Sequence, residues 1–169
     1  PVVRGMAEIG DTYKGVLYAG LMLTKEGPKV LEFNARFGDP ETQVILPRLK
    51  TDLVDIMLAV IDGSLNKMKI EWSDSAWVGI VLASEGYPGE YNTGFSISGL
   101  DKIDDDVFAF HAGSKQSNGD IVTDGGRILT VSATGKDLAL AREKAYTNAA
   151  RISFQGCYYR KDIALFAYV

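Results

Sequence analysis

The sequence of 169 residues contains one cysteine, Cys157, and one histidine, His111. A single cysteine cannot form an internal disulfide, and it also excludes a zinc site built from several cysteines. No apolar run approaches the roughly 20 residues that a transmembrane helix needs, and no signal peptide is recognisable, so no membrane partner is expected. Acidic residues outnumber basic ones by 22 to 18, and the net charge of −4 argues against a nucleic-acid partner. We therefore expect a soluble, cytoplasmic protein.

The motifs of two large enzyme classes are also missing. The chain contains neither the G-x-S-x-G elbow of serine hydrolases nor a Walker A loop. His111 alternates with Phe108 and Phe110 in a strand-like pattern, which is typical of a structural hydrogen-bonding histidine. Cys157 is expected to be a buried, inert thiol. The sequence assigns neither residue a role in catalysis.

The composition, with 46% hydrophobic and 24% charged residues, is that of an ordinary globular protein. A chain of this length buries roughly 70% of its unfolded surface, which is enough for a real core. The first residue is Pro1 rather than methionine, and the opening PVVRGMAEIG reads as the continuation of a longer chain. We therefore expect a fragment of a larger protein.

A strand with polar groups on one face is predicted at residues 29–36. Its side chains alternate between apolar and polar, and this period of two is typical of a half-buried strand. The apolar face is expected to pack into a core, and it consists of Leu31, Phe33, Ala35 and Phe37. The other face presents Glu32, Asn34 and Arg36, each about 7 Å from the next.

A second strand is predicted in the preceding run Gly15–Thr24, and the turn residues 25–28 join the two strands into an antiparallel hairpin. After the hairpin, Asp39 is the expected N-cap of a helix and Pro40 its first residue. Pro47 is expected to end or kink this helix. The polar strand face thus leads directly into a helix start.

A further helix is predicted with Thr51 as its N-cap and Gly63 as its C-terminal stop. Its apolar residues recur at helical spacing and form one stripe. These residues are Leu53, Ile56, Met57, Val60 and Ile61. Residues 64–75 lose this periodicity, and we place a domain boundary there, between a first part at residues 1–65 and a second at residues 75–169.

The second part is predicted to be a small α+β domain of several antiparallel strands and one long helix. The strand candidates are Trp77–Ala83, Phe95–Ile97, Val107–Ala112, Arg127–Ala133 and Cys157–Ile163. Residues 113–120 and 123–126 are expected to be turns, and residues 136–151 an amphipathic helix. The apolar stripe of this helix consists of Leu138, Ala141, Ala145, Ala149 and Ile152. The whole chain is therefore assigned to the α+β class.

The polar strand face has the chemistry of a metal site. Glu32 and Asn34 offer hard oxygen atoms, which Mg²⁺ and Mn²⁺ prefer, and an ion that also holds nucleotide phosphates needs only one or two protein carboxylates. Arg36 can clamp a phosphate or a carboxylate. Gly38 permits close backbone approach, and the adjacent helix start would attract an anion. The alternative is an exposed strand face of ordinary polar residues, with Asp39 acting only as a helix cap.

The segment LEFNARFGDPETQ, residues 31–43, strongly resembles the signature of the glycinamide ribonucleotide synthetases, a family of phosphoribosylamine–glycine ligases in the ATP-grasp superfamily. Further blocks resemble the same family in the same order, so that the resemblance covers residues from about 4 to 163. These blocks are YKGVLYAGLML, WVGIVLASEGYPGEY, VFAFHAG, DGGRILTVSATG and FQGCYYRKDIA. The R-F-G-D-P-E-T-Q core is highly specific to the family.

The resemblance implies the C-terminal part of an ATP-grasp domain, an antiparallel sheet with helices, followed by a small α+β C-terminal domain. It implies that Glu32 and Asn34 bind Mg²⁺ or Mn²⁺ beside ATP. It further implies that Arg36, also near the cofactor, contacts phosphate during acyl-phosphate formation. Asp39 and Glu41 match turn residues near the substrates, which makes Arg36 and Asp39 the catalytic candidates. The implied reaction joins phosphoribosylamine to glycine through a glycyl phosphate, giving glycinamide ribonucleotide, ADP and phosphate in de novo purine biosynthesis.

The family's N-terminal α/β domain and the first half of its ATP-grasp unit have no counterpart in this chain. The resemblance therefore implies that the chain is inactive alone, and that its partner is the missing N-terminal portion of the same enzyme. The ending LFAYV also departs from the family pattern. Two alternatives stay open: a non-catalytic binding or interaction module that keeps the fold, and an ATP-grasp ligase for a different carboxylate and amine. The intact Glu32, Asn34 and Arg36 argue against the first, and the complete motif against the second.

Overall fold

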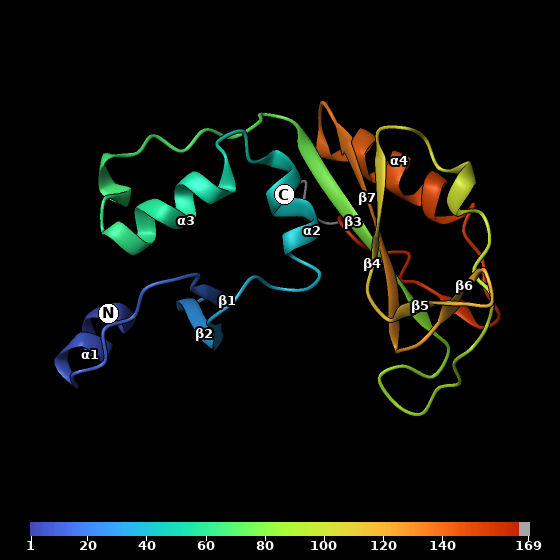
Figure 1. Cartoon of the computed structure of the whole chain (residues 1–169), viewed down its shortest axis with the longest axis horizontal. Helices are drawn as coiled ribbons and strands as arrows, with labels where there is room; N and C mark the ends of the chain where they lie inside the picture. The colour runs from blue at the N-terminus through green and yellow to red at the C-terminus, as the bar shows by residue number, and fades with distance from the viewer. Residues whose placement is uncertain (166–169) are drawn as a thin grey trace. The chain divides into compact units, whose positions relative to one another are not determined.

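The chain divides into two compact units (Figure 1). The computed structural model describes residues 1–165, so most of the LFAYV ending lies outside the described residues. The first unit comprises Pro1–Thr42 and Leu49–Ser73, and the second comprises Gln43–Arg48 and the residues from Asp74 onward. None of the helices within residues 1–165 is long and apolar enough to cross a membrane.

The first unit contains a two-stranded antiparallel hairpin and two α-helices. Its elements are α1 (Val2–Glu8), β1 (Tyr18–Thr24), β2 (Gly27–Asn34), α3 (Leu53–Asp62) and the 3₁₀ helix η2 (Leu65–Lys67). The pairing of β1 with β2 confirms the predicted antiparallel hairpin. The turn is shorter than expected, because only Lys25 and Glu26 lie between the two strands.

The apolar face of this hairpin is exposed within its unit, so the prediction that it packs into a core is wrong for this chain. Leu31 is 65% exposed and Phe33 is 45% exposed. The reason is that β1 and β2 form a sheet of only two strands, which cannot shield its own faces. Further large apolar side chains of the hairpin are exposed as well, namely Leu21, Met22, Leu23 and Val30.

The helix after the hairpin begins later than predicted. Residues 39–41 form a turn, and α2 (Thr42–Ile45) begins only at Thr42, whose backbone N–H and hydroxyl both donate to the carbonyl of Gly38. The predictions of Asp39 as N-cap and Pro40 as first helical residue are therefore wrong. The helix continues as the 3₁₀ helix η1 (Leu46–Arg48), and it ends directly after Pro47, as that proline predicts.

The start of α3 is also shifted by one residue. Asp52 is the N-cap, and its side chain accepts a hydrogen bond of 2.7 Å from the backbone N–H of Val54. The predicted cap, Thr51, instead accepts the backbone N–H of Glu71 at 2.7 Å. Gly63 ends the helix in the left-handed conformation, with φ of 70°, which confirms the predicted stop. Two members of the predicted apolar stripe, Met57 and Ile61, are exposed.

The second unit is a four-stranded antiparallel sheet with one long helix and a small separate hairpin. Its elements are α2 from Gln43 on, η1, β3 (Ala76–Ser84), the 3₁₀ helix η3 (Leu100–Lys102), β4 (Val107–His111), β5 (Ser114–Ser117), β6 (Asp120–Thr123), β7 (Arg127–Gly135), α4 (Leu138–Ala149) and β8 (Cys157–Tyr158). The strand order is β4-β7-β3-β8, and β5 pairs with β6. This α+β architecture is the predicted fold class.

The core of the second unit lies between the sheet and α4. Alternate residues of β3 point toward the helix and are fully buried, as Ile80 and Leu82 show. The predicted stripe of α4 packs against them, with Ala141, Ala145 and Ala149 all at 0% exposure. Because alanine has a small side chain, the helix approaches the sheet closely. The amphipathic helix predicted at residues 136–151 is thus confirmed with its buried stripe, although it spans only Leu138–Ala149.

The opposite face of the sheet is covered in part by the segment Gln43–Arg48. A Cβ atom placed on Gly79 would lie 2.9 Å from Cγ1 of Val44, so a glycine is needed where α2 crosses β3. A row of aromatic rings extends this face, with centroid distances of 5.8 Å from Trp77 to Phe108 and from Phe108 to Phe110.

Two segments of the second unit differ from the prediction. Residues 113–120, expected to be a turn, contain β5 and the start of the β5–β6 hairpin, whose loop is Asn118-Gly119 with positive φ at both residues. Residues 95–97, expected to be a strand, form only an isolated bridge from Ser96 to Val122. An Asn-Gly pair is the strongest short hairpin signal in a sequence, and it indicates the missed element.

The last predicted strand, Cys157–Ile163, is paired only over Cys157 and Tyr158. Beyond them the backbone bonds to side chains of α4. Arg142 donates to the carbonyls of Lys161 and Ile163, and the hydroxyl of Tyr146 donates to the carbonyl of Arg160. These carbonyls therefore already have partners other than a neighbouring strand.

Asn148 joins α4 to the loop before β4. Its side chain is fully buried; Oδ1 accepts the backbone N–H of Asp104 at 2.8 Å, and Nδ2 donates to the Asp104 carboxylate at 3.0 Å. Arg151 donates to the same carboxylate at 2.6 Å. A buried amide with several partners is costly to remove, because the remaining groups lose their hydrogen bonds.

We expect Asn148→Ala to lower the free energy of unfolding of the second unit by about 2–3 kcal/mol. Urea denaturation followed by the fluorescence of Trp77 measures this change in a Trp72→Phe background. The control is Thr147→Ala, an exposed change on the same helix, which should stay within about 0.5 kcal/mol. Equal effects of the two variants would show that the Asn148 network adds no stability.

A second prediction concerns pH. The hydrogen bonds from Arg151 and Asn148 lower the pKa of Asp104 below its ordinary value of 3.8. Asp104 therefore contributes stability that is present above this value and is lost as the pH falls through the lowered pKa of the folded state. Asp104→Asn should lower the melting temperature at neutral pH, and the difference from the unchanged chain should shrink in strong acid. The exposed neighbour variant Asp105→Asn should show no such pH-dependent difference.

Candidate functional site

Strand β2 places Glu32 and Asn34 on the same face, as their spacing predicts. Nδ2 of Asn34 donates to Oε1 of Glu32 at 3.0 Å. On the neighbouring strand, Gly20 lies opposite Glu32, and Tyr18 lies opposite Asn34. A Cβ atom on Gly20 would lie only 3.1 Å from Cγ of Glu32, so the glycine leaves the space in which the Glu32 side chain lies.

Tyr18 connects this face to a second carboxylate. The negative charge of Glu41 is the main cause that raises the pKa of the Tyr18 hydroxyl above its ordinary value of 10.0. Burial, a hydrogen bond to the same Glu41 carboxylate and the charge of Glu32 raise it further. One phenol therefore lies near two carboxylates. Tyr18 is absent from the residues predicted from the sequence, and the register of the hairpin is the signal that identifies it.

The turn after β2 is shaped around the Glu41 side chain. Gly38 is buried, and a Cβ atom placed on it would overlap the Glu41 carboxylate and lie 2.9 Å from Cδ of Glu41. The missing side chain at Gly38 thus allows Glu41 to fold back over the backbone. The family resemblance indicates Glu41 as a turn residue near the substrates, and the structure shows its side chain against Gly38.

Arg36 and Asp39 lie beyond the end of β2 and are both exposed. Nη1 of Arg36 donates to the carbonyl of the next residue, Phe37, at 3.0 Å. The structure therefore brings Glu32 and Asn34 together, whereas the guanidinium of Arg36 is turned to the backbone. An exposed guanidinium with other N–H groups can still bind a phosphate or carboxylate.

The oxygen atoms of the strand face fit a divalent cation. The hydrogen bond between Asn34 and Glu32 uses an amide nitrogen and one carboxylate oxygen, so Oδ1 of Asn34 and Oε2 of Glu32 remain as candidate ligands. Mg²⁺ binds such hard oxygens and completes its shell with water and phosphate. Within residues 1–165 there is no group of three or more His, Cys, Asp and Glu side chains arranged to hold a metal ion. The donor set therefore suits an ion that a bound phosphate helps to coordinate.

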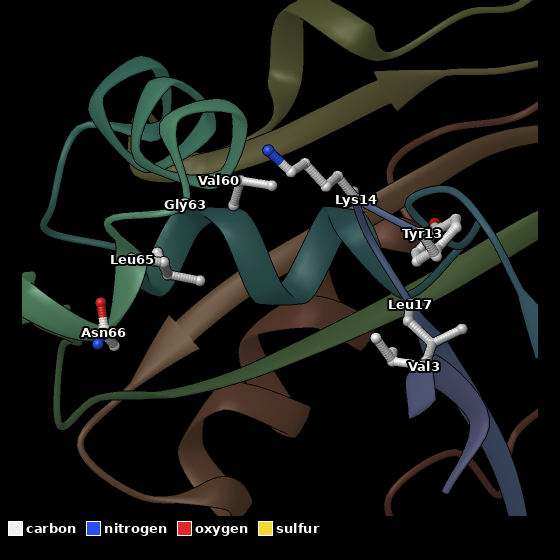
Figure 2. Close-up of a pocket in the computed structure, with 9 residues that line it drawn as sticks. Val3, Tyr13, Lys14, Leu17, Val60, Gly63, Leu65 and Asn66 are labelled. Atoms are coloured by element: carbon white, nitrogen blue, oxygen red, sulfur yellow. The ribbon is translucent and has the colours of Figure 1, made fainter. Parts of the chain in front are cut away.

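A cavity of about 320 Å³ lies elsewhere in the first unit, between the N-terminal segment and the end of α3 (Figure 2). Figure 2 shows Lys14 extending toward α3, where its Nζ donates to the carbonyl of Ile61 at 2.7 Å. Much of the lining is apolar and includes Val3, Leu17, Val60 and Leu65. Glu32 and Asn34 do not line this cavity, so it is distinct from the polar strand face.

His111 and Cys157 lie outside this face and have structural surroundings. Nδ1 of His111 lies 2.7 Å from the hydroxyl oxygen of Ser114, a hydrogen bond of the kind its strand position predicts. Cys157 is half-buried, and this burial raises the pKa of its thiol above the ordinary value of 9.0. A raised pKa keeps the thiol protonated and unreactive at neutral pH.

Two family models match the chain. The model described as phosphoribosylglycinamide synthetase, C domain, matches residues 77–165, just over half of the chain. The model described as phosphoribosylglycinamide synthetase, ATP-grasp (A) domain, matches residues 1–42, which include β1, β2 and the turn that carries Glu41.

Curated relatives are similar over nearly the whole chain. A phosphoribosylamine–glycine ligase of Caldanaerobacter subterraneus subsp. tengcongensis is 57% identical over 164 residues, covering 97% of this chain and 39% of the relative. The trifunctional purine biosynthetic protein adenosine-3 of Gallus gallus is 56% identical over 161 residues, covering 94% of this chain and 16% of the relative. The chain thus spans about two fifths of the bacterial ligase and a smaller share of the trifunctional protein.

A solved structure gives the same result for the fold. The crystal structure of phosphoribosylamine–glycine ligase from Thermotoga maritima is similar with a TM-score of 0.81 and 38% sequence identity. The match covers 95% of this chain and 39% of that chain. Sequence and fold therefore agree on one family.

Proposed function

The chain belongs to the phosphoribosylglycinamide synthetase family, and on this premise we propose that it forms the C-terminal part of an ATP-dependent ligase that joins phosphoribosylamine to glycine. The products are glycinamide ribonucleotide, ADP and phosphate, formed through a glycyl phosphate, in cytoplasmic purine biosynthesis. In this proposal residues 1–65 belong to the ATP-grasp domain, and residues 75–169 form a small α+β C-terminal domain. The observation that carries the proposal is the Glu32–Asn34 pair within the LEFNARFGDPETQ segment.

We assign the divalent ion, Mg²⁺ or Mn²⁺, to Glu32 and Asn34. When bound, such an ion neutralises charge on the phosphates of ATP. The geometry supports this assignment, because the hydrogen bond from Asn34 orients the Glu32 carboxylate before any ligand arrives. Because the side chain is already oriented, less conformational entropy is lost when the ion binds.

We assign phosphate contact to Arg36 and substrate contact to Asp39. The guanidinium of Arg36 follows the strand that carries the metal ligands, and it is exposed to an incoming anion. Its planar fork can bind the oxygens of an acyl phosphate at two points. Asp39 is also exposed, and its place in the turn between Arg36 and Glu41 supports a role next to the same substrates.

The remainder of the enzyme is the proposed partner of the hairpin. The relatives extend well beyond the matched region, and the hairpin exposes apolar side chains that its own unit leaves uncovered. Burial of such side chains is the main driving force of association. We therefore propose that the N-terminal portion of the enzyme covers Leu31 and Phe33 and supplies the remaining ATP contacts.

The activity can be tested in a chimera in which this chain replaces the matching part of the Caldanaerobacter relative. We expect phosphate release that requires ATP, glycine and phosphoribosylamine together, whereas this chain alone should show no turnover. Glu32→Gln in the chimera should lower kcat by at least about 100-fold, since it removes a charged group from the metal site. The matched control is Glu26→Gln on the same hairpin, which should leave kcat unchanged.

The chimera also separates the alternative functions. Turnover with a different carboxylate or amine, but not with glycine and phosphoribosylamine, would identify another ATP-grasp ligase. A folded chimera that binds its partner portion without any turnover would indicate a non-catalytic module. Unchanged kcat in the Glu32→Gln variant would remove Glu32 from the metal site.

The proposed partner surface gives a separate prediction. Leu31→Ser should weaken binding to the N-terminal portion of the Caldanaerobacter relative by about 10-fold or more, because it removes apolar surface from the contact. The melting temperature of this chain should not change, since Leu31 is exposed in it. Calorimetric titration measures the affinity. The control is Leu140→Ser on α4, also an exposed leucine, and an equal loss of affinity in that variant would contradict the assignment of the hairpin.

A further inference from the structure

A cavity of about 600 Å³ lies in the second unit, beside the loop that follows β3. Four consecutive residues line it, namely Gly89, Glu90, Tyr91 and Asn92. Its volume falls within the roughly 300–1,000 Å³ that is typical of small-molecule sites in proteins. The proposed function assigns substrate contacts only to the first unit, so this cavity is a candidate for a further binding site.

Backbone hydrogen bonds hold the loop against the sheet and against itself. At the end of β3, the backbone N–H of Ser84 donates to the carbonyl of Gly126 at 2.8 Å. The N–H of Tyr87 then donates to the carbonyl of Ser84 at 3.1 Å. One turn further on, the N–H of Gly89 donates to the carbonyl of Gly86 at 2.7 Å. The wall of the cavity is therefore ordered before a ligand arrives, and less entropy is lost on binding.

Two tyrosine rings of the loop pack on the backbone at Gly126. A Cβ atom placed on Gly126 would overlap the Tyr87 ring and would lie 3.1 Å from Cε1 of Tyr91. The centroids of the two rings are 6.3 Å apart. Tyr91 is nevertheless 41% exposed, and it lines the cavity. Part of its ring thus rests on the protein, and the remainder is free to contact a ligand.

The polar groups of the lining suit a ligand that donates hydrogen bonds. Glu90 contributes a carboxylate, which only accepts, and Asn92 contributes an amide, which both donates and accepts. None of the four lining residues is a lysine or an arginine, so the lining offers no charged partner to a phosphate. Within residues 1–165, neither the Glu90 nor the Asn92 side chain forms a hydrogen bond or an ion pair. Both are therefore available to a ligand.

A ribose ring with neighbouring hydroxyl groups matches this lining. The two oxygen atoms of a carboxylate can accept from two adjacent hydroxyls, and an acidic side chain binds a ribose hydroxyl in dinucleotide-binding sites. The amide of Asn92 can donate to a hydroxyl oxygen of the same sugar. The ring of Tyr91 offers an apolar surface to the C–H groups of the sugar. The cavity thus combines hydrogen-bonding groups for the hydroxyls with an apolar wall for the ring.

We propose that the cavity at residues 89–92 binds a ribose ring through its adjacent hydroxyls, with Glu90 as the main acceptor. This inference rests on the proposed function, because that reaction has two ribose-bearing substrates, ATP and phosphoribosylamine. The family model for the ATP-grasp domain matches residues 1–42, whereas the cavity lies in the region matched by the C-domain model. This division favours the ribose of phosphoribosylamine over that of ATP.

The test is the binding of ribose 5-phosphate to the 169-residue chain, measured by saturation-transfer NMR of the ligand at increasing concentration. The matched probe is 2-deoxyribose 5-phosphate, which lacks only one hydroxyl. We expect the unchanged chain to bind the deoxy sugar about 10-fold more weakly, because the Glu90 carboxylate then accepts one hydrogen bond fewer. Glu90→Gln should weaken binding of ribose 5-phosphate by about 10-fold and reduce the difference between the two sugars.

Two further variants check the site and its specificity. Gly126→Ala leaves every polar group in the chain but displaces the Tyr87 and Tyr91 rings, so it should also weaken binding of ribose 5-phosphate. The matched control is Glu143→Gln, an exposed carboxylate on α4, which should bind like the unchanged chain. Circular dichroism spectra that match the unchanged chain establish that each variant is folded.

The chimera distinguishes the two sources of ribose. If the cavity holds phosphoribosylamine, Glu90→Gln should raise the KM for that substrate by about 10-fold and leave the KM for ATP unchanged. A raised KM for ATP alone would assign the cavity to the ribose of ATP and overturn the assignment to phosphoribosylamine.

The remaining outcomes separate this inference from the proposed function. Absence of ribose 5-phosphate binding, equal binding of the two sugars, or unchanged binding in Glu90→Gln overturns the inference. Displacement of ribose 5-phosphate by glycine, which has an ammonium group and no hydroxyl, would show a cation site and overturn it as well. None of the NMR measurements depends on Glu32. A chimera without turnover, together with discrimination between the sugars by the chain, therefore overturns the proposed function alone.

Discussion

The register of the β1–β2 hairpin is the constraint on which the candidate site depends. It pairs Tyr18 with Asn34 and Gly20 with Glu32, so that a phenol, an amide and a carboxylate share one region of the sheet. A shift of one residue would turn Glu32 and Asn34 to the opposite face, because side chains alternate along a strand. The two-residue turn at Lys25-Glu26 sets the pairing from Thr24 with Gly27 to Leu21 with Val30, and a register shift between Gly20 and Leu21 then brings Glu32 and Asn34 opposite Gly20 and Tyr18.

Small residues matter to this site as much as charged ones. Gly20 leaves the volume in which the Glu32 side chain lies, and Gly38 leaves the volume in which the Glu41 carboxylate lies. The same device recurs in the second unit, where Gly79 allows Val44 to pack on the sheet. In each case the backbone approaches a neighbouring side chain more closely than a Cβ atom would permit.

The sequence predicts the features that depend on the periodicity of helices and strands. It does not predict which strands pair or which segments bury a given face. The spacing of Ala141, Ala145 and Ala149 predicts their common burial, because one helix face is enough to define it. The alternation around Glu32 predicts which residues share a face of the strand. It does not predict whether another segment buries Leu31 on the opposite face, and in this structure Leu31 is exposed. Tyr18 is close to Asn34 only through strand pairing, which a single strand's pattern does not contain.

The two units differ in how completely each buries its own apolar side chains, and this difference bears on function. The second unit buries residues such as Ile80 and Leu82 completely between sheet and helix. The first unit carries Glu32 and Asn34 on a two-stranded hairpin, an arrangement that is marginally stable without cover. Any partner that binds the apolar side of the hairpin stabilises the strand pairing by mass action. Because the same pairing orders the oxygen atoms on the polar side, the proposed cover of one face and the proposed cation binding at the other would favour each other.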